Sequence, residues 1–225
     1  MRRIRAVALV CAGPVSRGMV ARLPGVAEHL AWVKAPSYRL ASRAVNALRA
    51  GIPVYQYEEL AAASLILISV PYEAEEETVR ELASSRLDLR NRAVVVMDTP
   101  KDSNSMRALR DRGALVATLQ PIGASEDRIF VIEGEQEAIR HMQRAMTPAA
   151  SRGMQVLTPS GKSRLLAGVD EATQRFLPVV ASVTDHFKAA GLSKQQSETL
   201  AQTLISSSMR AYFRAGRRAM TARAD

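Results

Sequence analysis

The chain has 225 residues, a formal net charge of +9 and 47% hydrophobic residues. These values exclude a disordered protein and allow one large domain or two small ones with buried cores. Aromatic residues make up only 4% and the arginines are dispersed, so we interpret the charge as surface charge and expect no nucleic-acid partner.

The composition also bears on location. The single cysteine, Cys11, cannot form an intrachain disulfide, which fits a reducing compartment. No apolar run reaches the roughly 18 residues that span a bilayer. The opening MRRIRAVALVCAG has the basic head and short apolar run of a signal peptide, but the run has strand length and a turn and helix pattern follows it. We therefore expect a cytoplasmic protein without a membrane partner.

Short apolar runs alternate with amphipathic stretches over the first part of the chain. The predicted strands cover residues 4–10, 30–34, 54–55, 65–70, 93–97, 115–118, 129–133 and 154–158. The predicted helices cover residues 17–23, 40–50, 58–63, 74–84, 104–112 and 135–146. Such alternation predicts crossover connections and a mostly parallel sheet. The run LILI at 65–68 is apolar on both faces, which is typical of a central strand covered by helices.

The pattern changes after residue 158, because residues 162–218 show helical periodicity alone. We predict an α/β Rossmann-like domain with a mostly parallel sheet at 1–158, followed by an all-α domain at 159–225. The apolar stripe through 162–189 needs a covering surface. A second copy of the chain would supply it in a homodimer, and the last helix of the same chain is the alternative.

The turn after the first strand resembles a phosphate-binding turn. A dinucleotide-binding fold places G-x-G-x-x-G here, with the pyrophosphate on the amides of the following helix. The three glycine positions hold Cys11, Gly13 and Ser16, so only the middle glycine is kept. A P-loop is disfavoured, because Met19 stands where that motif needs lysine. We predict that this turn binds the cofactor, through Cys11, Gly13, Pro14, Val15 and Ser16.

The second predicted strand indicates which dinucleotide is bound. In NAD-binding proteins this strand ends in an acidic residue that binds the ribose hydroxyls. Here it ends in Lys34, and Ser37 and Arg39 follow. Cations and hydroxyls suit a ribose phosphate, so the sequence favours NADP over NAD.

Several segments in order resemble one group of proteins. They are VALVCAGPVSRG, SLILISVPYEA, DRGALVATLQPIGA, IFVIEGE, and the segment from LTPSGKSRLLAGVDEAT through FKAAGL. The chain is thereby similar to bacterial proteins of unknown function that join a Rossmann-like domain to a helical one. That group is distantly related to pyrroline-5-carboxylate reductase, the deazaflavin-dependent NADP reductases and the 6-phosphogluconate dehydrogenase superfamily.

The resemblance implies positions for the nicotinamide half of the cofactor. The turn at Ser69, Val70 and Pro71 would pass beside the nicotinamide ribose, and Thr99 would lie nearby. The first helix of the second domain would face the nicotinamide.

The chain departs from the group in that helix and in the segment LQP at 119–121. Leu165 and Leu166 replace the usual tyrosine–histidine pair, Gln174 lies near an expected asparagine, and Gln120 replaces a histidine. Hydride transfer to a carbonyl or imine needs a proton donor, which leucine cannot supply. The remaining candidates are Lys162, Asp170, Glu171 and Gln174. Lysine is the proton relay in several relatives, and we predict Lys162 and Gln174 as the catalytic residues.

Two functions follow from these observations. One is an NADP-dependent oxidoreductase that acts on a small molecule between the domains. The other is a non-catalytic ligand-binding or assembly protein that has kept the fold. No cluster of histidine, cysteine or carboxylate side chains has metal-ligand spacing in the sequence, so we expect no metal.

Overall fold

A computed structural model describes residues 6–12, 23–123 and 129–216 of the chain. It divides the chain into two compact units, Met1–Arg164 and Leu165–Asp225. The division falls within one helix, so the domain boundary expected after residue 158 stays a prediction. Among the residues described, no helix is long and apolar enough to cross a membrane.

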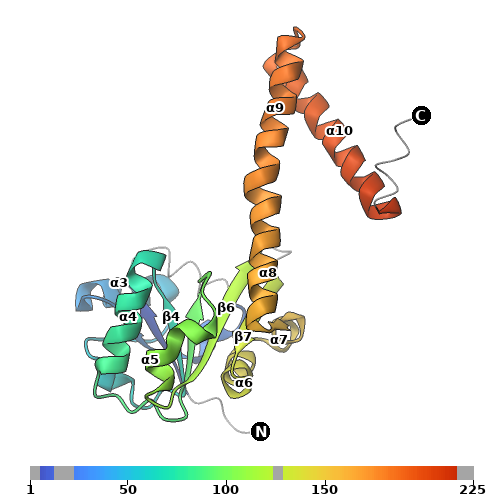
Figure 1. Ribbon diagram of the computed structural model, residues 1–225. Coiled ribbons are helices and arrows are strands. Elements are labelled where there is room, and N and C mark those ends of the chain that lie inside the picture. Colours follow the sequence, from blue (N-terminus) through green and yellow to red (C-terminus); the bar gives the residue numbers. More distant parts are fainter. Residues whose placement is uncertain (1–5, 13–22, 124–128, 217–225) are drawn as a thin grey trace. The chain divides into compact units, whose positions relative to one another are not determined.

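Unit 1 is built on a sheet flanked by helices (Figure 1). The sheet has eight strands in the order β3-β2-β1-β4-β5-β6-β7-β8. Neighbouring strands run parallel except β6 and β7, which are antiparallel. This confirms the predicted α/β class with a mostly parallel sheet. The strands are β1 (Val7–Cys11), β2 (Leu30–Lys34), β3 (Ile52–Val54), β4 (Leu65–Ser69), β5 (Ala93–Met97), β6 (Leu115–Ile122), β7 (Ile129–Gly134) and β8 (Gln155–Leu157).

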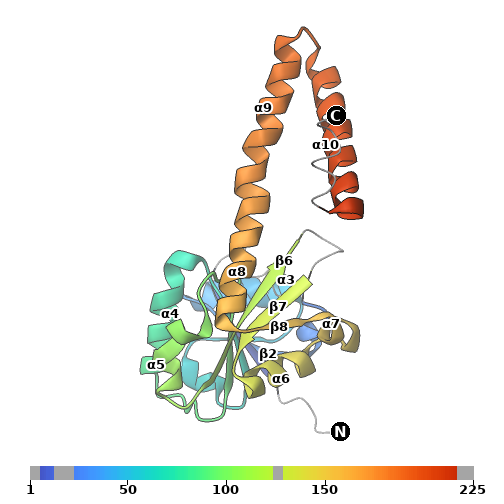
Figure 2. The ribbon, with the colours of Figure 1, turned by 45° about the vertical axis from the view of Figure 1, so that its right-hand side comes forward.

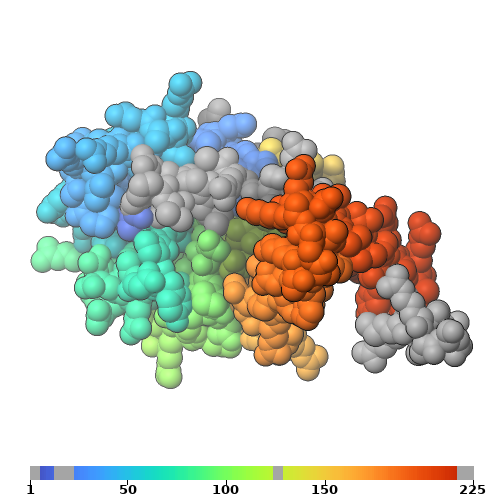
Figure 3. All heavy atoms as spheres, turned by 90° about the horizontal axis from the view of Figure 1, so that it is seen from above, coloured from blue at the N-terminus to red at the C-terminus, as the bar shows by residue number. Residues whose placement is uncertain are grey.

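Helices cover both faces of the sheet, which explains why β1, β4 and β5 are buried at every position. Alternate residues of β1 enter different cores: Val7 and Leu9 face one, and Ala8 and Val10 the other. α3 and α6 cover the first core, and α4 and α5 the second. Figure 3 shows α3 in blue and α4 in green on opposite flanks of unit 1. The helices of this unit are α2 (Val26–His29), α3 (Tyr38–Leu48), α4 (Tyr72–Ser84), α5 (Arg107–Arg110), α6 (Gln136–Ala145), α7 (Pro148–Gly153) and the start of α8 (Pro159–Asp170).

Several predicted elements differ in extent from the structure. The helix expected at 58–63 is the 3-10 turn η1 (Tyr57–Leu60), because the segment is too short for several α-helical turns. The helix expected at 104–112 is split into the 3-10 turn η2 (Ser103–Met106) and the short α5. β6 continues to Ile122, four residues beyond the prediction, because its end pairs with β7. The helix expected at 17–23 lies almost wholly outside the described residues.

Unit 2 is helical. It contains the rest of α8, a π-helical turn η4 (Glu171–Arg175), α9 (Phe176–Ala189) and α10 (Lys194–Ala215). α9 and α10 form a hairpin (Figure 2). Ser193 begins α10 with a capping box, in which its hydroxyl accepts from Gln196 N and the Gln196 side chain accepts from Ser193 N.

Candidate functional site

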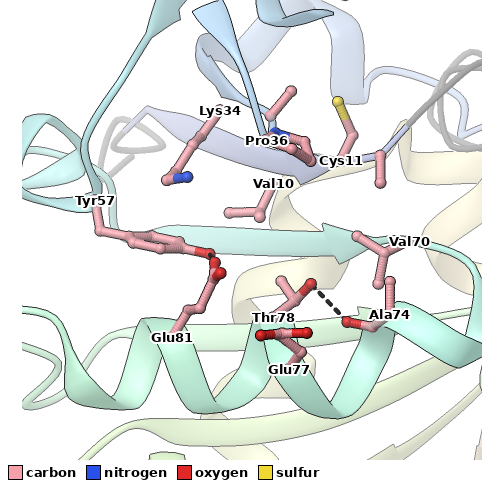
Figure 4. A pocket seen from close by; sticks show the side chains of 12 residues that line it. Val10, Cys11, Lys34, Pro36, Tyr57, Val70, Ala74, Glu77, Thr78 and Glu81 are labelled. Atoms are coloured by element: carbon pink, nitrogen blue, oxygen red, sulfur yellow. Dashed lines mark hydrogen bonds between the residues drawn. The ribbon is translucent and has the colours of Figure 1, made fainter.

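A pocket of about 310 Å³ opens at the carboxyl ends of β1, β2 and β4 (Figure 4). The strand order reverses here, since β2 and β3 extend from one side of β1 and β4 to β8 from the other. In open α/β sheets, ligands bind outside the carboxyl ends of the strands at such a reversal. The pocket is lined by Val10, Cys11, Ala12, Lys34, Ala35, Pro36, Tyr57, Val70, Ala74, Glu77, Thr78 and Glu81.

One side of the pocket is formed by a cation–π contact between Lys34 and Tyr57. The Lys34 ammonium lies 4.2 Å from the centre of the Tyr57 ring. The Tyr57 hydroxyl donates a hydrogen bond to Glu81 Oε2 at 3.1 Å. Burial first, and Glu81 second, raise the pKa of Tyr57 well above its ordinary value, so the phenol keeps its proton near neutral pH. Lys34 is the basic side chain of this wall.

The opposite wall is one face of α4. Ala74, Glu77, Thr78 and Glu81 are spaced by three or four residues, so they share that face. The Thr78 hydroxyl donates to Ala74 O at 2.8 Å, while Glu77 and Glu81 present carboxylates (Figure 4). The pocket can therefore accept hydrogen bonds from amino or hydroxyl groups at α4 and can bind an anion at Lys34.

Ser37 is the N-cap residue of α3. Its hydroxyl oxygen accepts a hydrogen bond from Leu40 N at 3.3 Å and so caps the helix. Arg39 is exposed in the first turn. The amino end of an eleven-residue helix carries partial positive charge, which adds to that of Lys34 and Arg39. The three residues predicted to select the cofactor thus lie along one short stretch, with Lys34 in the pocket wall.

The residues expected beside the nicotinamide lie at the carboxyl ends of β4 and β5. Ser69 ends β4 and is buried, Val70 lines the pocket, and exposed Pro71 precedes α4. Thr99 is fully buried after β5, and its hydroxyl oxygen accepts from Lys101 N at 3.1 Å.

The turn after β1 is described only at its start. Cys11 is 2% exposed and lines the pocket. Gly13, Pro14, Val15 and Ser16 lie outside the described residues. Their predicted contacts with a pyrophosphate therefore stay a prediction.

The turn after β5 has an uncommon backbone. Asp98 adopts a left-handed conformation with φ of 58°, which few residues other than glycine take up. Its carboxylate accepts a hydrogen bond from Gln120 Nε2 at 2.7 Å. Gln120, which replaces the expected histidine, therefore ties the end of β5 to β6.

Lys162, a catalytic candidate, lies in the first turn of α8 and is only 2% exposed. Its ammonium donates to Lys101 O at 2.5 Å and to Thr118 Oγ1 at 2.8 Å. Burial lowers the pKa of this lysine, and the nearby carboxylates of Glu133, Glu75 and Asp102 oppose the effect.

Gln174, the second candidate, is exposed in the π-helical turn of unit 2. The catalytic roles predicted for Lys162 and Gln174 stay predictions, and the hydrogen bonds of Lys162 to protein atoms favour a positioning role for that residue instead. In the part of the chain that the structure describes, no group of three or more histidine, cysteine, aspartate or glutamate side chains could hold a metal ion.

Sequence reasoning missed the α4 side of the pocket. Glu77 belongs to the acidic run at 73–77, which is typical of a solvated helix N-terminus, and Glu81 and Tyr57 stand in amphipathic segments. The available signal for this wall was the three- and four-residue spacing of Ala74, Thr78 and Glu81, which places them on one face of a helix. The helix after the fourth strand begins where the strand order reverses, so one of its faces adjoins the ligand-binding position.

No known family profile and no curated protein matches this sequence. Solved structures do resemble it. An imine reductase variant from Myxococcus stipitatus in complex with NAD+ has a TM-score of 0.71 at 10% identity, over 97% of this chain and 78% of its own. An imine reductase from Bacillus cereus has a TM-score of 0.66 at 18% identity, over 94% and 76%. The pyrroline carboxylate reductase of Plasmodium falciparum, with NADP bound, has a TM-score of 0.61 at 13% identity, over 99% and 83%. At these identities the likeness shows a common fold, a Rossmann-like domain followed by a helical one.

Proposed function

We propose that this chain is an NAD(P)-dependent oxidoreductase that acts on a small molecule and prefers NADP. The observation that carries the proposal is the pocket at the reversal of strand order, with Lys34 on one wall and carboxylates on the other. Structures of the same fold with NAD+ or NADP bound support it. When bound, the cofactor supplies or accepts the hydride.

The residues of the pocket fit the adenosine end of such a cofactor. Ribose hydroxyls and the adenine amino group can donate hydrogen bonds to the carboxylates of Glu77 and Glu81. Lys34, Arg39 and the start of α3 offer positive charge to a ribose phosphate. The predicted turn after β1 would hold the pyrophosphate, and Ser69 to Pro71 and Thr99 would adjoin the nicotinamide.

A thermal shift with NADP, NADPH, NAD and NADH tests this function. A ligand at 100 times its dissociation constant stabilises the folded state by about 2.7 kcal/mol, which is readily measured. We expect the phosphorylated pair to raise the melting temperature more than the other two. Absence of any shift at millimolar ligand would refute cofactor binding.

A non-catalytic ligand-binding or assembly protein is the second candidate. Leu165 and Leu166 favour it, because neither can donate the proton that reduction of a carbonyl or imine requires. A chain that binds NADPH tightly yet never oxidises it, with any carbonyl or imine offered, would support this second function.

We also propose that the protein is a homodimer. Among the described residues of unit 2 only Ser197 and Ala201 are buried, whereas large apolar side chains on α9 and α10 are exposed. Two hairpins, one from each chain, would make a four-helix core that covers them. The exposed side chains include Phe176, Leu177, Val179, Leu200, Leu204, Met209, Tyr212 and Phe213. A monomeric mass by light scattering at high concentration would contradict the dimer.

A further inference from the structure

A chain of buried polar groups lies where β6 and β7 pair, at Thr118 and Glu133. The Lys162 ammonium donates to Thr118 Oγ1 at 2.8 Å, and the Thr118 hydroxyl donates to Glu133 Oε2 at 3.1 Å. Ser103 donates twice to the same carboxylate, from its hydroxyl at 2.6 Å and from its backbone N–H at 2.8 Å. All four side chains are at most 3% exposed. Hydrogen bonds of these side chains, together with that of the Ser103 backbone N–H, join α8, β6, β7 and η2.

This network is costly unless it is complete. A charge taken out of water costs several kcal/mol unless opposite charge and hydrogen bonds replace the water. Glu133 supplies the opposite charge to Lys162 through Thr118, and each carboxylate oxygen has at least one donor. Arg110 extends the network, because its guanidinium donates to Ser103 O at 3.1 Å. A side chain this enclosed holds its neighbours more rigidly than a surface ion pair does.

The second hydrogen bond of Lys162 reaches the turn after β5. It ends on Lys101 O at 2.5 Å, while Lys101 N donates to the Thr99 hydroxyl. The Lys101 ammonium pairs with buried Glu75 of α4 at 3.6 Å. Turn 98–102 is thus fixed by α8 on one side and by α4 on the other, and Asp98 at its start is tied to β6 through Gln120.

We propose that Lys162 is a positioning residue, which holds turn 98–102 in the shape that receives the nicotinamide half of the cofactor. The inference rests on the proposed function, which assigns that turn to the nicotinamide. Lys162 acts through the Lys101 carbonyl, since its ammonium is enclosed and directed at protein atoms. The adenosine half, which we assign to the pocket at Lys34, does not depend on it.

The proposal is tested with a variant and two probes that divide the cofactor. Lys162→Met keeps the unbranched side chain as far as the fourth atom and removes the ammonium with its donors. Calorimetric titration with NADPH and with 2′,5′-ADP measures the whole cofactor and its adenosine half separately. We expect the variant to bind NADPH roughly tenfold more weakly, about 1.4 kcal/mol, and to bind 2′,5′-ADP within about twofold of the wild type. Equal weakening of both ligands, or of neither, would overturn the proposal.

A second variant serves as the control for misfolding. Lys162→Met leaves the buried Glu133 carboxylate without its cation. Lys162→Met combined with Glu133→Gln removes both charges, so we expect the double variant to be more stable than Lys162→Met alone. We expect the double variant to keep the selective loss of NADPH affinity. Lys194→Met removes an exposed ammonium and is expected to bind both ligands as the wild type does.

Hydrogen exchange separates failure of this inference from failure of the proposed function. A wild-type chain that binds neither probe refutes the function. Positioning is still measured by amide exchange in residues 98–103, which should be faster in Lys162→Met and in the double variant than in Lys194→Met. Unchanged exchange in that segment would overturn the positioning role whatever the chain binds.

Discussion

Replacement of Lys34 by alanine should reduce the preference for NADPH over NADH. The ammonium lies in the pocket wall, 4.2 Å from the Tyr57 ring centre, where we place the ribose phosphate. A hydrogen bond to a charged group contributes about 1.5–3 kcal/mol. Lys34 is only half-buried, so solvent screening favours the lower end of that range. The expected fall in selectivity is about tenfold.

The ratio of the two affinities isolates the phosphate contact. Alanine also removes the interaction of Lys34 with the Tyr57 ring, which is worth about 0.5–1 kcal/mol, but this loss affects both cofactors alike. The phosphate contact is present with NADPH alone and therefore remains in the ratio. The effect should shrink as salt is added, since the site is partly open to solvent.

The assay uses the single tryptophan of the chain. Trp32 lies on β2, two residues before Lys34, so energy transfer from its indole to the reduced nicotinamide reports binding of NADPH and NADH. Arg90→Ala is the matched control, because it removes one exposed positive charge near the amino end of β5, whereas the pocket lies at the carboxyl ends of the strands. Glu81→Gln should change the selectivity in the opposite direction, because it removes a negative charge from the pocket. An affinity ratio that stays within about twofold of wild type in Lys34→Ala would refute the assignment of the phosphate to Lys34.

Three further predictions concern stability. Gly134→Ala should lower the melting temperature by roughly 4–8 °C, or about 2 kcal/mol, because Gly134 has φ of 137° and a Cβ there would lie 2.4 Å from the Ala117 backbone; scanning calorimetry at one pH would measure it, and an unchanged transition would contradict it. Burial first, and Arg144 second, lower the pKa of His141 below 6.5, so the folded state binds fewer protons than the unfolded one and stability should fall as the pH falls from 6.5 through the folded pKa; His141→Gln should lessen this fall in denaturant titrations, and an identical pH profile would exclude the mechanism. Arg92→Met should cost about 2 kcal/mol in urea unfolding, because the guanidinium donates to several backbone carbonyls between η1 and β5; a variant as stable as wild type would show that water replaces those bonds.

Much of the fold could be predicted from local patterns. The run LILI of β4 is apolar on both faces, and only a strand between two helical layers buries both. The antiparallel direction of β7 was not predictable, because an apolar strand looks the same in either direction. It follows instead from the short connection between β6 and β7, which leaves no room for a crossover helix.

The candidate site could be predicted only in part. Lys34 follows from its place at the end of the second strand. The buried network could not be foreseen, because Thr118 and Glu133 each interrupt an apolar strand and Lys162 lies more than forty residues from Thr118. A carboxylate in IFVIEG did signal that a partner must exist, since a buried charge is rarely tolerated alone. Only the tertiary structure shows which residue provides it.

The scarcity of buried side chains in unit 2 has a consequence for how the protein matures. A hairpin with only Ser197 and Ala201 buried among its described residues gains little hydrophobic free energy by itself. If a second copy supplies the missing contacts, the folding of unit 2 requires two chains to meet, so its rate rises with the concentration of the protein. Dilution should then loosen α9 and α10 at concentrations where the sheet of unit 1, which has its own core, is still intact.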